Sequence, residues 1–95
     1  IVTNIRWSKK MEELYQLIEE KIKASGYPGD IDGREFYRDV SEEADKQENG
    51  TYVFMIKKTE EILYKGCMDI MDKEFDLHYV DIYVGDKSFH VDFDS

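Results

Sequence analysis

Hydrophobic and polar residues alternate along most of the segment from Thr51 to Asp94. Successive side chains of a β-strand point to opposite faces of the sheet, so this period of two predicts strands with one apolar and one polar face. The clearest strands are residues 75–84 and 88–94. Their apolar faces hold Val80, Ile82 and Val84 in the first and Phe89, Val91 and Phe93 in the second.

A two-residue turn at Gly85 and Asp86 would join these two strands as a hairpin, because a type II′ turn prefers glycine in its first central position. This turn sets a register in which Ile82 faces Phe89, Val80 faces Val91 and Asp81 faces His90. Upstream, Phe75, Leu77 and Tyr79 have the opposite parity to Val80 and Ile82. Such a change within one strand indicates a β-bulge or a bend, which we expect near Tyr79.

Two further strands are predicted before the hairpin. Residues 51–58 are rich in β-formers and apolar on both faces through Met55, which predicts a central strand or one covered on both sides. Residues 60–74 fit two periods. A helix capped by Thr59 would group Leu63 with Cys67, but Gly66 disfavours it, so we predict a strand. On one face that strand would carry Ile62, Tyr64, Met68 and Ile70.

The N-terminal half has the period of amphipathic helices. Apolar residues at positions 11, 14, 15, 18 and 22 predict a helix that starts after Ser8 and ends before Gly26 and Pro28. Asp32 and Glu35 have capping-box spacing for a second helix, expected to run to about Glu48. Its apolar stripe is narrow, which predicts a surface helix with few core residues: Phe36, Tyr37, Val40 and Ala44.

Together these elements predict an α+β fold: two N-terminal helices packed on one face of a three- to four-stranded antiparallel β-meander. The length of 95 residues suits a single domain spanning residues 1–95. Residues 1–10 could form a short edge strand or a disordered lead-in. Met11 is a possible natural start, in which case those ten residues carry no information about the fold.

Charge and cysteine content narrow the classes of partner. With 22 acidic and 13 basic residues, the net charge of −9 opposes direct binding to nucleic acid or to an anionic membrane. It favours a basic protein partner, although an acidic surface also simply keeps a small domain soluble. A lone cysteine cannot form an intramolecular disulfide, and no apolar run could span a bilayer. We therefore expect a cytoplasmic protein.

No sequence motif for catalysis or for a cofactor is present, so we predict a non-enzymatic protein without a cofactor. His90, Asp92 and Asp94 with Asp81 opposite could hold a divalent ion, but a solvated strand face has the same pattern, and no metal is predicted. Near Asp30 and Asp32 a calcium loop fails, because Pro28 would occupy its first ligand position. Cys67 is interpreted as a small hydrophobic residue.

The remaining signal is a set of tyrosine and acidic residues on the polar side of the sheet, a composition typical of binding surfaces. We predict that a basic protein binds there, as in an accessory, inhibitor or immunity-type protein. The predicted contact residues are Tyr79, Asp81, Tyr83, His90 and Asp92. One alternative is a nucleic-acid mimic that uses an acidic helix face, with Asp39, Glu42, Glu43, Asp45 and Glu48 joined by Asp30 and Asp32. Another is a self-associating structural protein that buries its sheet face or a free edge strand in a homodimer.

Overall fold

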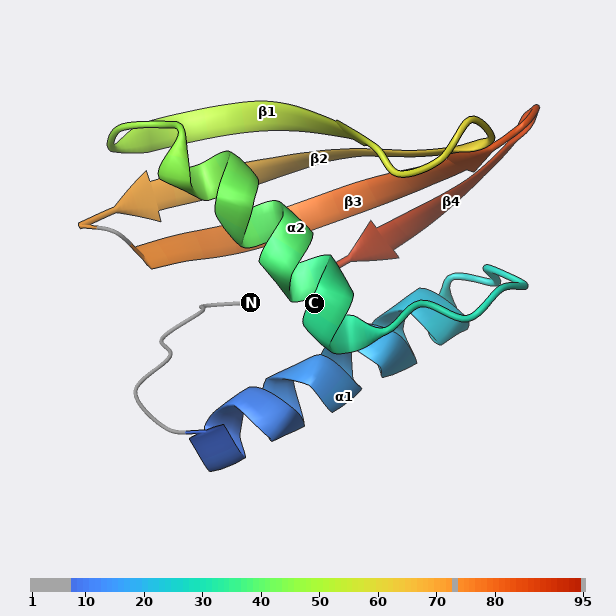
Figure 1. Cartoon of the computed structure of the whole chain (residues 1–95), viewed down its shortest axis with the longest axis horizontal. Coiled ribbons are helices and arrows are strands. Elements are labelled where there is room, and N and C mark those ends of the chain that lie inside the picture. The colour runs from blue at the N-terminus through green and yellow to red at the C-terminus, as the bar shows by residue number, and fades with distance from the viewer. Residues whose placement is uncertain (1–7, 73, 95) are drawn as a thin grey trace.

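The structure, a computed structural model, describes residues 8–72 and 74–94. It confirms the predicted α+β architecture: two helices precede four antiparallel strands that form one sheet in the order β1-β2-β3-β4 (Figure 1). Residues 62–71 form a strand, as predicted. Residues 1–7 of the predicted edge strand or lead-in lie outside the described residues, whereas residues 8–10 belong to the first helix and are not a disordered lead-in. The elements are α1 (Ser8–Ala24), α2 (Gly33–Asp45), β1 (Gly50–Lys57), β2 (Ile62–Met71), β3 (Glu74–Val84) and β4 (Lys87–Asp92).

Helix α2 crosses one face of the sheet and supplies the centre of the core (Figure 1). The helix contributes the few core residues that the narrow stripe predicts: Phe36 and Val40 are each only 1 % exposed, Ala44 is 8 % exposed, and Tyr37 packs at the border of the core. The stripe is narrow because α2 lies flat on the sheet, where one line of side chains meets the strands. Phe36 packs there against the rings of Tyr64 and Phe93, with centroids 5.4 and 6.1 Å apart.

Both ends of α2 have identifiable causes. The carboxylate of Asp32 accepts hydrogen bonds from the backbone N–H groups of Arg34 and Glu35, which confirms the predicted N-cap. The helix ends at Asp45, so the predicted extension to Glu48 is wrong. Its last turn tightens because the N–H of Lys46 is directed to the carbonyls of Glu43 and Ala44. Residues 46–49 then connect α2 to β1.

Helix α1 packs against α2 and β4 and adds Ile18 and Ile22 to the core, each 2 % exposed. The two helices approach closely at Gly33, where an added Cβ would lie 2.2 Å from the carbonyl oxygen of Tyr15. The end of α1 near Gly26 is as predicted, since that glycine has the positive φ of 92° that suits a helix C-terminus. Neither described helix is long and apolar enough to cross a membrane.

The hairpin register is the one that the sequence predicts: Ile82 faces Phe89, Val80 faces Val91 and Asp81 faces His90. The bulge is also present. Between β2 and β3, Cys67 pairs with Tyr79 but Met68 pairs with Leu77, so His78 is the additional residue of the bulge. The predicted position near Tyr79 is therefore correct to within one residue. Both His78 and Tyr79 consequently lie on the face opposite the core.

Strand β1 is at the edge of the sheet, so the prediction of a central or doubly covered strand is wrong. In a meander the first strand has one neighbour, and here the helices cover only one face. The apolar residues on the other face therefore stay accessible: Val53 is 63 % and Met55 is 59 % exposed.

Gly66 is required by the packing between three strands. It faces Phe54 in the register of β1 and β2, and an added Cβ would lie 2.6 Å from Phe54 Cζ and 2.6 Å from the carbonyl oxygen of Tyr79. The aromatic ring occupies the space that a side chain would need. The glycine that argues against a helix here is thus also necessary for the strand.

Replacement of this glycine should destabilise the fold. We expect Gly66→Ala to lower the free energy of unfolding by about 1–3 kcal/mol, because ring and backbone must both move. Urea unfolding followed by circular dichroism would measure the change. Lys65→Ala, at the exposed neighbouring position, is the control and should change the free energy by less than about 0.5 kcal/mol. Equal stability of Gly66→Ala and wild type would contradict this packing.

Candidate functional site

The candidate site is the face of the sheet that α1 and α2 leave uncovered, which we call the open face. Strand alternation decides its members, because every second residue points away from the core. The bulge adds one residue to this face in β3. The open face comprises Thr51, Val53, Met55, Lys57, Leu63, Lys65, Cys67, Asp69, Met71, Glu74, Asp76, His78, Tyr79, Asp81, Tyr83, Ser88, His90 and Asp92.

Four of the five predicted contact residues come together on this face. Asp81 Oδ1 lies 2.5 Å from His90 Nδ1. The ring of Tyr79 packs beside that imidazole, with centroids 5.5 Å apart, and Tyr79 pairs in register with Asp92. Tyr83 lies further along β3, opposite Ser88. Tyr79, Asp81 and Tyr83 are half-buried, whereas His90 and Asp92 are exposed, so the cluster offers both fixed and accessible side chains.

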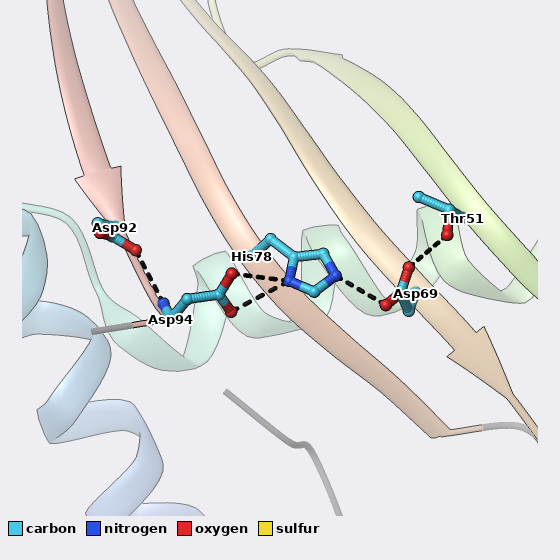
Figure 2. A network of polar contacts seen from close by, with 5 residues as sticks. All are labelled: Thr51, Asp69, His78, Asp92 and Asp94. Atoms are coloured by element: carbon cyan, nitrogen blue, oxygen red, sulfur yellow. Dashed lines mark hydrogen bonds and ion pairs between the residues drawn. The ribbon is translucent and has the colours of Figure 1, made fainter.

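A second polar network surrounds His78 (Figure 2). His78 Nε2 lies 2.8 Å from Asp69 Oδ2 on β2, and Nδ1 lies 2.9 Å from Asp94 Oδ2 just beyond β4. Asp69 also accepts a hydrogen bond from the hydroxyl of Thr51 on β1, at 2.5 Å. The N–H of Asp94 donates to Asp92 Oδ1 at 2.9 Å. The network therefore links one residue from each of the four strands, and it also includes Asp94 from the segment after β4.

His78 is not among the predicted site residues, although the change of parity near Tyr79 contained the signal. A bulge places two consecutive residues on one face, and His78 is the residue before Tyr79. The alternation in the sequence also groups Asp94 with His90 and Asp92. In the structure Asp94 contacts His78 instead, whereas Asp81 contacts His90. The four residues weighed as metal ligands therefore do not form one cluster.

The two carboxylates determine the protonation of His78. Hydrogen bonds to Asp69 and Asp94 raise the pKa of this imidazole above its ordinary value of 6.5. In return, the hydrogen bonds from Thr51 and His78 lower the pKa of Asp69 below 3.8. Asp69 also faces Asp76 across the pair of β2 and β3, an unfavourable contact between like charges. The imidazolium offsets this repulsion.

Asp69, Asp76 and His78 also bring potential ligand atoms within 4.8 Å of one another. Carboxylate oxygens with one imidazole nitrogen suit a borderline divalent ion. In this structure, however, both ring nitrogens of His78 already contact carboxylates, and a cation would have to displace the proton that these contacts favour. We therefore assign no metal to this group.

Cys67 lies between the two clusters and is half-buried. Burial, together with the charges of Asp69 and Asp94, raises the pKa of its thiol above 9.0. The reactive thiolate is therefore disfavoured at neutral pH. Both ring nitrogens of His78 already contact carboxylates, so this imidazole is not free to accept the thiol proton.

The acidic residues proposed for a helix face do not form one uninterrupted surface. Asp39 contacts Lys58, with Oδ2 and Nζ 2.8 Å apart, and Lys58 also pairs with Glu35. Glu43 pairs with Lys46 at 2.8 Å. The remaining members are exposed: Glu42 and Asp45 on α2 and Glu48 beyond its end.

The His78 network should make stability depend on pH. Because folding raises the pKa of His78, its contribution is fully present below about pH 6.5 and is lost as the pH rises through the higher folded pKa. Because folding lowers the pKa of Asp69, its contribution is present above about pH 3.8 and is lost as the pH falls through the lower folded pKa. The network should therefore stabilise most between these two values.

Urea unfolding of wild type and His78→Gln across pH 4 to 9 would measure this effect. We expect the difference in unfolding free energy between them to shrink as the medium becomes alkaline. Asp86→Asn, in the exposed turn between β3 and β4, is the control and should follow the wild-type profile. A difference that stays constant from pH 5 to 9 would show that His78 contributes through packing and not through its charge.

No protein-family model, curated protein or solved structure shows significant similarity to this chain.

Proposed function

We propose that this protein is a small non-catalytic binding module whose partner, a basic protein, docks on the open face of the sheet. The observation that carries the proposal is the one-sided covering of the sheet. The uncovered side presents half-buried tyrosines beside accessible apolar and acidic residues. Such a combination is typical of protein interfaces, where Tyr is enriched in the centre and charged groups lie at the rim.

The charge of the open face supports a basic partner. Its acidic residues outnumber its lysines, Lys57 and Lys65, and the whole chain has a net charge of −9. Complementary charge accelerates encounter and disfavours wrong partners. The carboxylates on or next to this face are Asp69, Glu74, Asp76, Asp81, Asp92 and Asp94.

The tyrosines supply the anchors in this proposal. The ring of Tyr79 packs against the imidazole of His90, and its backbone pairs with Cys67 on β2. The side chain would therefore lose little entropy on binding. Tyr83 lies two residues further along the same face. Exposed Val53 and Met55 extend the apolar area toward β1. A rigid aromatic centre with apolar surroundings is where binding energy usually concentrates.

The state of the nucleophile and base candidates supports a role without catalysis. Cys67 favours the neutral thiol, and the ring nitrogens of His78 are occupied by carboxylates. The Nδ1 atom of His90 contacts Asp81, which orients the ring beside Tyr79. These contacts arrange polar side chains for recognition and leave Cys67 without an adjacent base.

The test compares two variants with the same change of charge on different surfaces. Asp81→Asn/Asp92→Asn changes the open face, and Glu42→Gln/Asp45→Asn changes the exposed side of α2. Wild-type protein would capture partners from lysate of the source cell, and the captured basic protein would be purified for calorimetry. We expect the open-face variant to bind about tenfold or more weakly and the helix variant to bind like wild type.

The other outcomes separate the competing hypotheses. Equal loss of affinity in both variants would show that only net charge matters, against a specific open-face site. Loss confined to the helix variant, with competition by DNA for the same partner, would support the nucleic-acid mimic. Wild-type affinity in the open-face variant would contradict the proposal directly. Urea unfolding of each variant would confirm that both remain folded.

A further inference from the structure

The two edge strands of the sheet, β1 and β4, differ in how far the rest of the chain covers their backbone. At β4, the Lys21 Nζ of α1 donates to the carbonyl of Asp92 at 3.2 Å, and Tyr27 packs edge-on against Phe89 at 5.7 Å. Along β1, by contrast, neither helix lies beyond the strand (Figure 1). The backbone of one edge is therefore shielded, whereas the described residues leave the other available.

Strand β1 also lacks the usual devices that prevent edge pairing. It has eight residues, contains no proline and no acidic residue, and keeps a continuous register with β2. Its only charged residue is Lys57, at the end. Val53 and Met55 expose more than half of their surface beside this edge. Long edge strands with exposed apolar residues are templates for a further strand.

We propose that β1 pairs antiparallel with β1 of a second copy, so that two chains form one continuous sheet. This homodimer is independent of the basic partner proposed for the open face. A two-fold axis relates the copies. If residue i of the first copy faces residue j of the second, residue j of the first copy must therefore face residue i of the second. Antiparallel pairing further requires facing residues to share a face, which restricts the possible registers.

The register centred on Phe54 satisfies both conditions with the largest overlap. Val53 then faces Met55 of the second copy, and this apolar pair occurs twice on the open face. On the core side, half-buried Tyr52 faces Ile56. Lys57 faces Thr51, so no like charges oppose each other. A shift by two residues would leave Lys57 facing either Val53 or Asn49 and would shorten the pairing.

Charge complementarity favours a second copy over a basic protein at this edge. Lys57 itself is positive and would repel a basic strand. In the dimer it lies beside Thr51 of the second copy, whose hydroxyl donates to Asp69 at 2.5 Å. The ammonium, which contacts Glu60 of its own copy at 3.4 Å, would then also lie near a carboxylate of the other copy, at both ends of the paired strands. The contact between the copies is thus made by β1, a strand without acidic residues in a chain of net negative charge.

The dimer would also extend the open face. Val53 and Met55 would move from the border to the centre of an eight-stranded sheet, with one tyrosine cluster on each side. A partner with two basic segments could then engage both copies.

Sedimentation velocity over a range of concentrations tests the dimer with three proteins. Wild type should reach a dimer as concentration rises. Val53→Lys/Met55→Lys places like charges opposite each other and should weaken dimerisation by about tenfold or more. Leu17→Lys/Met71→Lys replaces two other exposed apolar residues with the same charge and should dimerise like wild type. Mixing the double-lysine variant with Val53→Glu/Met55→Glu should restore a mixed dimer.

Cross-linking tests the register in a Cys67→Ser background. A mixture of Val53→Cys and Met55→Cys chains should form a disulfide-linked pair under mild oxidation, because these positions face each other. Val53→Cys alone should not, since diagonal neighbours lie about 7–8 Å apart, beyond the usual disulfide span of about 4.4–6.8 Å.

A wild-type monomer at every concentration overturns the proposal. So does a dimer that persists in Val53→Lys/Met55→Lys and yields no mixed disulfide, because its interface would then lie elsewhere. Neither result bears on the open-face partner, which the charge-matched variants test separately.

Discussion

Burial of one side of the meander under α2 is the constraint on which the rest of this structure depends. Phe36 and Val40 meet Val80, Ile82 and Val91 in a layer where none of the five is more than 1 % exposed. Burial of apolar side chains is the main driving force for folding. Once this layer forms, strand alternation determines every residue on the opposite face. The acidic and tyrosine side chains are exposed there as a consequence of the core.

The bulge is the single departure from that alternation, and it shapes the candidate surface. Without it, either His78 or Tyr79 would point into the apolar layer. The additional residue lets both lie on the open face, where each joins a different cluster. Tyr79 packs beside His90, and His78 bridges Asp69 and Asp94. A one-residue irregularity in β3 thus provides the fixed aromatic centre and the charged network next to it.

The open face and the β1 edge would bind different partners. The open face is acidic and aromatic, whereas the β1 edge has no acidic residue and ends in Lys57. A basic protein suits the first, and a second copy of the chain suits the second. The contrast with β4 matters here, because Lys21 of α1 and Tyr27 of the segment after it contact that strand, while β1 receives no such cover among the described residues. The basic partner would depend on the tyrosine and acidic side chains of β3 and β4, and the second copy on the backbone edge of β1, while Val53 and Met55 border both contacts.

Local patterns in the sequence determined the helices, the strands, the hairpin register and the bulge, because each depends on residues close together along the chain. The turn at Gly85 and the parity change near Tyr79 are of this kind. Tertiary structure alone decided that β1 lies at the edge, that α2 ends at Asp45 and lies at the centre of the core, and that His78 meets Asp69 and Asp94. The physical reason is that these features depend on which distant segments pack together, and periodicity carries no information about that choice.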